Sequence, residues 1–158
     1  MKSIRTFARG WIFAIAMLGL VPPAYAEFHL FAIDQIFTNA DGSVQFVVLF
    51  EDLNFDGENL WKGQFISTTH RDFSQYNAYK FPNSLASSKT SRKRVLVATE
   101  GFAALGIVTP DFVVPNQFID TVPGSVQYAG VSTVVYDSLP TDGVHAIDLN
   151  GKVIQNLA

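Results

Sequence analysis

Two neighbouring runs of β-branched and aromatic residues constrain the fold of this chain most strongly. They span residues 29–37 and 43–50, and Asn39 to Gly42 between them has the composition of a hairpin turn. In the second run, both alternating faces are largely apolar, which is typical of a strand that is covered on both sides. The pattern therefore predicts an antiparallel hairpin near the middle of a sheet.

Further runs of strand length follow at short intervals, separated by Pro, Gly, Asn and Asp. This rhythm is typical of an all-β sandwich, and it predicts strands at 60–69, 77–81, 94–99, 125–129, 132–136 and 144–148. Residues 100–106 are predicted to form one short helix that ends at a glycine. Three prolines predict an irregular crossing at 107–123. No repeat or second domain is evident, so residues 27–158 are expected to form a single β-sandwich domain.

The N-terminal segment has the three parts of a secretory signal peptide. Three basic residues precede a short apolar run at 11–21, and two prolines and Ala24-Tyr25-Ala26 follow it. The apolar run is shorter than the roughly 20 residues that a membrane-spanning helix needs. We therefore expect residues 1–26 to be a signal peptide cleaved before Glu27, with an uncleaved anchor as the alternative. The remaining chain is expected to be secreted or periplasmic and to have no membrane span.

Charge and cysteine content exclude several kinds of function. The signal segment contains three of the eleven basic residues and none of the fourteen acidic ones, which leaves a net charge of −6 after cleavage. That balance argues against a nucleic-acid partner, because such binding depends on Lys and Arg that replace counterions. The chain has no cysteine, so thiol chemistry and disulfides are excluded and burial alone must stabilise the fold.

Three stretches resemble a family of exported bacterial proteins of unknown activity. They are residues 27–49, 93–118 and 128–147, which together cover roughly half of the chain after the signal segment. The first stretch also resembles, more distantly, the opening hairpin of lamin-tail-type domains, which are immunoglobulin-like β-sandwiches. The resemblance implies export and an immunoglobulin-like sandwich. It implies no activity and supplies no catalytic residues.

The sharpest local motif is an acidic loop at residues 52–58. Asp52, Asn54, Asp56 and Glu58 place oxygen atoms at alternate positions, and Gly57 stands where the chain must turn. This matches the first half of an EF-hand-type calcium loop, although the twelfth position is Gly63 and lacks the bidentate glutamate. Two interpretations stay open, namely a calcium site built on these four residues and an ordinary polar turn between strands.

Other combinations of reactive residues are weak. His29, His70 and His145 lie far apart and share no metal-binding spacing. No GxSxG motif is present, and Gly124-Ser125 is expected to open a strand. No catalytic residue is therefore predicted.

Two surface features have both a functional and a structural interpretation. The basic cluster of Lys89, Arg92, Lys93 and Arg94 is either a contact for an anionic polymer or a solvated loop beside an apolar strand. Four aromatic residues are either a sugar-stacking face or part of the core, and they are Trp61, Tyr76, Tyr79 and Tyr128.

Together these features predict an exported, non-catalytic binding or adhesion module. Its partner is expected to be an extracellular or cell-surface component of unknown identity, with calcium as the only candidate cofactor. Two alternatives stay open: a hydrolase whose site is assembled only by the fold, and a structural accessory domain. A concave pocket in which a carboxylate, His or Ser converge would distinguish the hydrolase.

Overall fold

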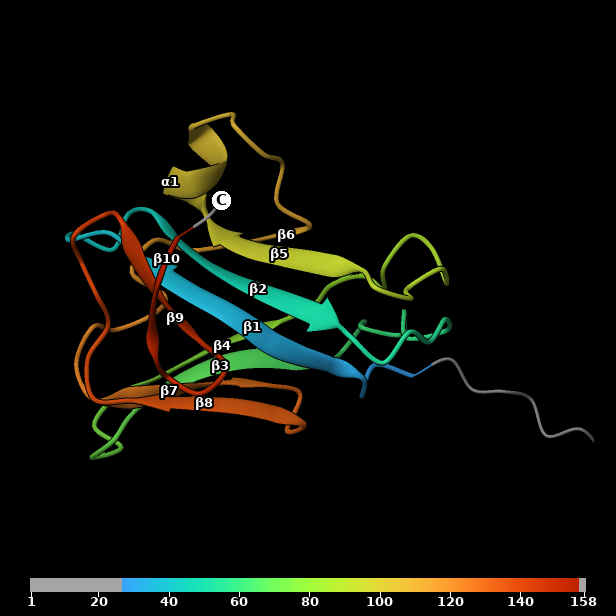
Figure 1. Ribbon diagram of the computed structural model, residues 1–158, viewed down its shortest axis with the longest axis horizontal. Coiled ribbons are helices and arrows are strands. Elements are labelled where there is room, and N and C mark those ends of the chain that lie inside the picture. The colour runs from blue at the N-terminus through green and yellow to red at the C-terminus, as the bar shows by residue number, and fades with distance from the viewer. Residues whose placement is uncertain (1–26, 157–158) are drawn as a thin grey trace, which may run out of the picture.

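The structure is a computed structural model that describes residues 27–156. The predicted signal peptide at 1–26 and the last two residues lie outside the described part. Two β-sheets face each other across a shared apolar interior (Figure 1). The prediction of a mostly β-strand sandwich is therefore confirmed.

The larger sheet has six strands and the smaller sheet has four. In spatial order the larger sheet is β10 (Val153–Gln155), β9 (His145–Asp148), β1 (Phe31–Thr38), β2 (Gln45–Glu51), β5 (Arg94–Thr99) and β6 (Phe112–Val114). The smaller sheet is β4 (Tyr76–Lys80), β3 (Phe65–His70), β7 (Gly124–Tyr128) and β8 (Ser132–Tyr136). Neighbouring strands are antiparallel except for the parallel pair β5 and β6.

The predicted hairpin is present and lies inside the larger sheet. Strands β1 and β2 pair antiparallel from Phe31 opposite Glu51 to Thr38 opposite Gln45. The second strand lies between β1 and β5, as its two apolar faces indicate. One face contributes Val47 and Leu49 to the interior between the sheets.

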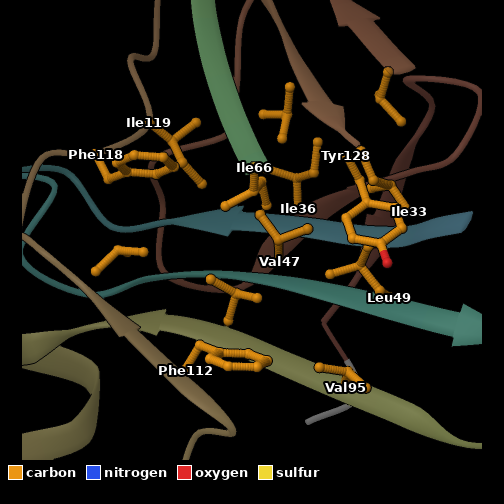
Figure 2. Close-up of a cluster of buried hydrophobic side chains, with 14 of the residues drawn as sticks. Ile33, Ile36, Val47, Leu49, Ile66, Val95, Phe112, Phe118, Ile119 and Tyr128 are labelled. Atoms are coloured by element: carbon orange, nitrogen blue, oxygen red, sulfur yellow. The ribbon is translucent and has the colours of Figure 1, made fainter. Parts of the chain in front are cut away.

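Buried hydrophobic side chains from both sheets, among them Val47, Ile66 and Tyr128, pack together in the interior (Figure 2). Part of this interior is an aromatic cluster. Its centre is Trp61, which is fully buried and comes from the loop before β3. The Trp61 ring lies 5.0 Å from the rings of Phe31 and Phe81 and 4.8 Å from that of Tyr128, between ring centroids. Such edge and tilted contacts suit the quadrupoles of aromatic rings. Trp61 therefore belongs to the core and to no exposed sugar-stacking face.

A second apolar cluster lies on the outer side of the larger sheet under helix α1 (Glu100–Ala104). Thr99 caps this helix by accepting a hydrogen bond from the Phe102 amide. The Phe102 ring then meets the Phe46 ring edge-on, and Phe46 stacks on Phe37. This cover explains why the outward face of β2 is apolar.

Some boundaries differ from the prediction. The helix ends at Ala104, and the strand expected at 60–69 begins only at Phe65, because Trp61 turns into the core instead of extending the ladder. The crossing predicted at 107–123 contains one short strand, β6, and β10 has no counterpart in the prediction. Within residues 27–156, no helix is long and apolar enough to cross a membrane.

Candidate functional site

The acidic loop at 52–58 lies at one end of the sandwich, and its oxygens accept hydrogen bonds from different neighbours. Asn54 Oδ1 accepts from the Ser91 hydroxyl at 2.7 Å, and Asp56 Oδ1 accepts from the amides of Thr90 and Ser91 at 2.8 and 3.0 Å. Glu58 is buried and points elsewhere, with Oε2 accepting from the Leu30 amide at 3.1 Å. These bonds tie the loop to the rest of the protein, as a polar turn would be tied.

The fourth candidate ligand, Asp52, contributes its carbonyl oxygen to the Arg92 guanidinium at 2.9 Å. Beside it, the fully buried Glu51 accepts the amides of Leu53, Asn54 and Arg92 at 2.9 to 3.1 Å. Across residues 27–156, no group of three or more His, Asp or Glu is arranged to hold a metal ion. Calcium binding at Asp52, Asn54, Asp56 and Glu58 stays a prediction.

Two of the four residues of the basic cluster, Arg92 and Arg94, contact neighbouring side chains. The guanidinium groups of Arg92 and Arg94 lie over the Phe50 ring, 4.7 and 4.0 Å from its centroid. Arg94 also lies 3.4 Å from the Asp34 carboxylate. Cation–π contacts and an ion pair of this kind favour the structural interpretation of the cluster.

The three histidines are not brought together, and each contacts a carboxylate of its own. His29 lies 2.6 Å from Glu27, and His145 lies 2.6 Å from Asp142, both at exposed positions. His70 differs, because it ends β3 and its side chain is mostly buried. The turn between β3 and β4 that follows it lies at the opposite end of the sandwich from the acidic loop (Figure 1).

The segment that reaches His70 is held in place by side chains of both sheets. Gln45 is buried in β2, and its amide bonds both backbone groups of Ile119, accepting from the nitrogen at 2.9 Å and donating to the carbonyl. From the smaller sheet, the Thr68 hydroxyl and the Asn77 amide both donate to the carbonyl of Phe118, at 2.9 and 3.0 Å. Side chains of both sheets therefore bond the backbone groups of the crossing that have no partner strand. These bonds also place Asp120 next to the end of β3.

His70 lies between Ser74 and Asp120. Its Nδ1 is 3.0 Å from the Ser74 hydroxyl oxygen, and its Nε2 is 2.8 Å from the Asp120 carboxylate. The second contact is close but lies off the N–H axis, so it is an ion-pair contact and not a linear hydrogen bond. A serine, a histidine and an aspartate thus meet at the end of β3, and His70 also lines a hollow on the surface.

The hydrogen bonds of Ser74 differ from those of the serine in a hydrolytic triad. The Ser74 hydroxyl donates its only proton to Asp72 Oδ1 at 2.6 Å, and the Ser74 amide donates to the same oxygen at 3.0 Å. These two bonds, together with the His70 charge, lower the pKa of the Asp72 carboxyl. With its proton on Asp72, Ser74 accepts from His70, whereas a nucleophilic serine donates to its base. The bonds among His70, Asp72 and Ser74 stabilise the turn between β3 and β4.

The outer face of the smaller sheet is hollowed beside this turn. The hollow has a volume of about 350 Å³, within the range of small-molecule sites. Its lining comes from the middle strands β3 and β7, from the turn and from β4 and β8. The lining residues are Ser67, Thr69, His70, Arg71, Phe73, Tyr76, Gly124, Ser125, Gln127 and Val135.

Several side-chain hydroxyls in the hollow are available to hydrogen-bond a ligand. Within residues 27–156, no protein group hydrogen-bonds the side-chain hydroxyls of Ser67, Thr69, Ser125 or Tyr76. In contrast, the backbone groups of β3 and β7 pair with strands on both sides, because each strand has two neighbours in the sheet. The hollow therefore offers side-chain hydroxyls and no free strand edge.

The charges at the hollow are neutralised from outside it. Arg71 lies 2.7 Å from the Asp137 carboxylate and donates to the Tyr136 carbonyl at 3.2 Å. His70 has its contact with Asp120. No carboxylate is among the described residues that line the hollow. A ligand there would meet an uncharged, hydroxyl-rich and aromatic surface.

Phe73 stands at the rim in an unusual conformation. Its ring is 84 % exposed, and its φ of 59° lies in the left-handed region that bulky residues rarely adopt. Tyr76, the first residue of β4, is also exposed. Of the four aromatic residues considered for a sugar-stacking face, only Tyr76 is exposed at the rim of the hollow. Tyr128 is in the core with Trp61, and Tyr79 packs against it.

Comparisons with protein-family models, with curated proteins and with solved structures find no match to this chain. The family resemblance of the sequence stays a prediction. The function proposed below is therefore argued from the geometry of the site.

Proposed function

We propose that this protein is an exported, non-catalytic binding module that takes its ligand in the hollow on the outer face of the smaller sheet. One observation carries the proposal. Four hydroxyl-bearing side chains without a protein partner and an exposed aromatic rim lie together at a single concave place. Convergent polar groups in a concave surface are the usual mark of a binding site.

The neighbouring His70 cluster supports binding more than catalysis. Its distances would suit a hydrolase, but the Ser74 proton is bonded to Asp72, and the His70 ring is oriented by Asp120. A base that already donates toward serine cannot remove the serine proton. The cluster instead fixes the turn that presents Phe73 and Arg71 to the hollow.

The setting of the module follows from its sequence. The signal-like segment at 1–26 supports secretion or a periplasmic location, and the net charge of −6 after cleavage supports a partner other than nucleic acid. The resemblance to lamin-tail-type domains supports an immunoglobulin-like arrangement of the sandwich. An extracellular or cell-surface partner fits these three features.

Fragment mapping tests the proposal without assuming a ligand. The protein is expressed from its full 158-residue sequence with ¹⁵N label, and amide shifts are recorded with a mixed library of small sugars, amino acids and aromatic acids. We expect the shifts to gather on β3, β7 and the β3–β4 turn. Shifts that gather elsewhere, or no shifts with any fragment, would overturn the proposal.

A blocking variant sharpens this test. Ser125→Tyr places a ring inside the hollow, whereas Val153→Tyr places the same ring on an exposed residue of β10 in the larger sheet, outside the lining. We expect Ser125→Tyr to abolish the fragment shifts and Val153→Tyr to leave them unchanged. Equal effects of the two variants would contradict the assignment of the site.

A further inference from the structure

The chemistry of the hollow points to a class of ligand, and this inference rests on the proposed function. We infer that the hollow binds a neutral oligosaccharide chain. The argument uses the hydroxyls, the two rim rings, the charges and the position of the hollow on the sheet.

The hydroxyl groups are arranged for a partner that both donates and accepts. Each Ser, Thr or Tyr hydroxyl can donate one hydrogen bond and accept others. Thr69 and Ser125 are direct neighbours across β3 and β7, and Ser67 lies next to Gln127 one step along the same strands. A sugar chain carries hydroxyls of the same dual character and would satisfy all of these groups. An apolar ligand would bury them without partners, at a cost for each group.

The two rim rings supply the apolar part of such a site. Phe73 and Tyr76 are 84 % and 63 % exposed and line the same hollow. Aromatic rings present a broad apolar face, and the C–H side of a sugar ring can lie on it. Tyr76, Thr69, Ser125 and Val135 form one line across the four strands. At about 4.8 Å per strand the line is about 14 Å long, which suits a chain better than a single ring.

The charges exclude an ionic ligand. The basic side chains at the hollow, His70 and Arg71, already contact Asp120 and Asp137. An anionic polymer would have to displace these carboxylates, and the net charge after removal of the signal segment would repel it. A cationic ligand would find no carboxylate in the described lining. The occupant is therefore uncharged.

The position on the sheet excludes a peptide strand. Peptides that add to a sheet bind the unpaired backbone of an edge strand. The hollow lies over β3 and β7, which are inner strands with paired backbones. Only side chains are offered there, so an extended peptide would leave its own amide groups poorly matched.

The conformation of Phe73 supplies an independent indication of function. A bulky residue in the left-handed region is strained, and strained residues of this kind gather at binding sites. The Phe73 side chain gains no burial to offset this cost. Presentation of the ring to a ligand accounts for its placement.

The test uses soluble dextran, galactomannan and β-glucan as neutral probes, and alginate as the anionic comparison. Binding to the protein expressed from its full sequence is followed by amide shifts and calorimetry. We expect at least one neutral polymer to shift the residues of the hollow and alginate to shift none. Phe73→Ala and Tyr76→Ala should each raise the Kd about tenfold, the scale of one lost aromatic contact. Phe65→Ala is the matched control, because its ring is exposed on the same face but outside the hollow.

Each other outcome would overturn the inference. If no neutral polymer binds while fragment mapping still marks the hollow, the ligand class is wrong and the binding function stands. If alginate binds there, the ligand is anionic. If the same amides shift with protein concentration alone, the occupant is a second copy of the chain. If Phe65→Ala weakens binding as much as Phe73→Ala, the site lies elsewhere on the face.

Discussion

Replacement of Gln45 by leucine tests how the larger sheet and the irregular crossing are joined. The side chain is 1 % exposed, and its amide both donates to and accepts from the backbone of Ile119. The same amide also donates to the buried Thr38 hydroxyl at 3.0 Å. Leucine has a similar size and fills the same space but makes none of these bonds. The change therefore removes hydrogen bonds with little change in packing.

The expected loss of stability follows from the groups left behind. The amide and the carbonyl of Ile119 would both be buried without a partner, at about 1–3 kcal/mol each. We expect the free energy of unfolding to fall by about 2–6 kcal/mol, a large part of the about 5–15 kcal/mol typical of a domain. Asp120, the next residue, should also lose its position beside His70.

Urea unfolding, followed by the fluorescence of buried Trp61, measures this loss. The matched control is Gln127→Leu, the same change at an exposed position of β7, which should alter the free energy of unfolding by no more than about 0.5 kcal/mol. A loss below about 1 kcal/mol for Gln45→Leu, or equal losses for both variants, would refute the reasoning.

Three further predictions concern other parts of the chain. In Gly124→Ala the new methyl group would lie 2.6 Å from the Thr69 carbonyl oxygen, so urea unfolding should show a loss of about 1–3 kcal/mol; an unchanged midpoint would contradict this. Burial raises the pKa of the Tyr128 and Tyr136 phenols, aided by the nearby charges of Glu58 and Asp120. The two neutral phenols therefore contribute fully to the free energy of unfolding below about pH 10. Above that pH the free energy of unfolding should fall by about 2.7 kcal/mol per pH unit for the pair. If absorbance at 295 nm shows that both tyrosines ionise before the protein unfolds, this prediction is contradicted. Because Asn54 Oδ1, Asp56 Oδ1 and Glu58 Oε2 already accept protein hydrogen bonds, neither calcium nor chelator should move the melting temperature, and a calcium-dependent rise would support the calcium site.

Local pattern was sufficient to predict most of the strands. Alternation and turn composition placed the β1–β2 hairpin and the strands at 94–99 and 132–136, because those segments bury one or both faces in regular order. The strand β10 was missed because three residues with one partly buried side chain give almost no periodic signal.

The roles of the aromatic residues depended on tertiary structure. Trp61 follows a polar loop, and nothing nearby in sequence shows that it would turn inward to the centre of the core. Tyr76 begins a strand of alternating exposure and remains outside. Local sequence is similar at the two positions, so only the packing of the sheets distinguishes them.

The site was the least predictable part. His70 and Asp120 meet only because Gln45, Thr68 and Asn77 hold the crossing, and these partners are separated by tens of residues. The one local signal was a phenylalanine inside the polar turn 70–76, where burial is hard to achieve. An exposed aromatic in such a turn is a reason to look for a ligand.

Phe73→Gly tests the central claim most directly, because binding and stability should change in opposite directions. Glycine tolerates the left-handed conformation and no buried contact is lost, so the free energy of unfolding should stay the same or rise by up to about 1 kcal/mol. Binding of fragments or neutral polymers at the hollow should be lost in the same variant. Full binding together with a clear loss of stability would show that Phe73 serves the fold, and it would contradict the account.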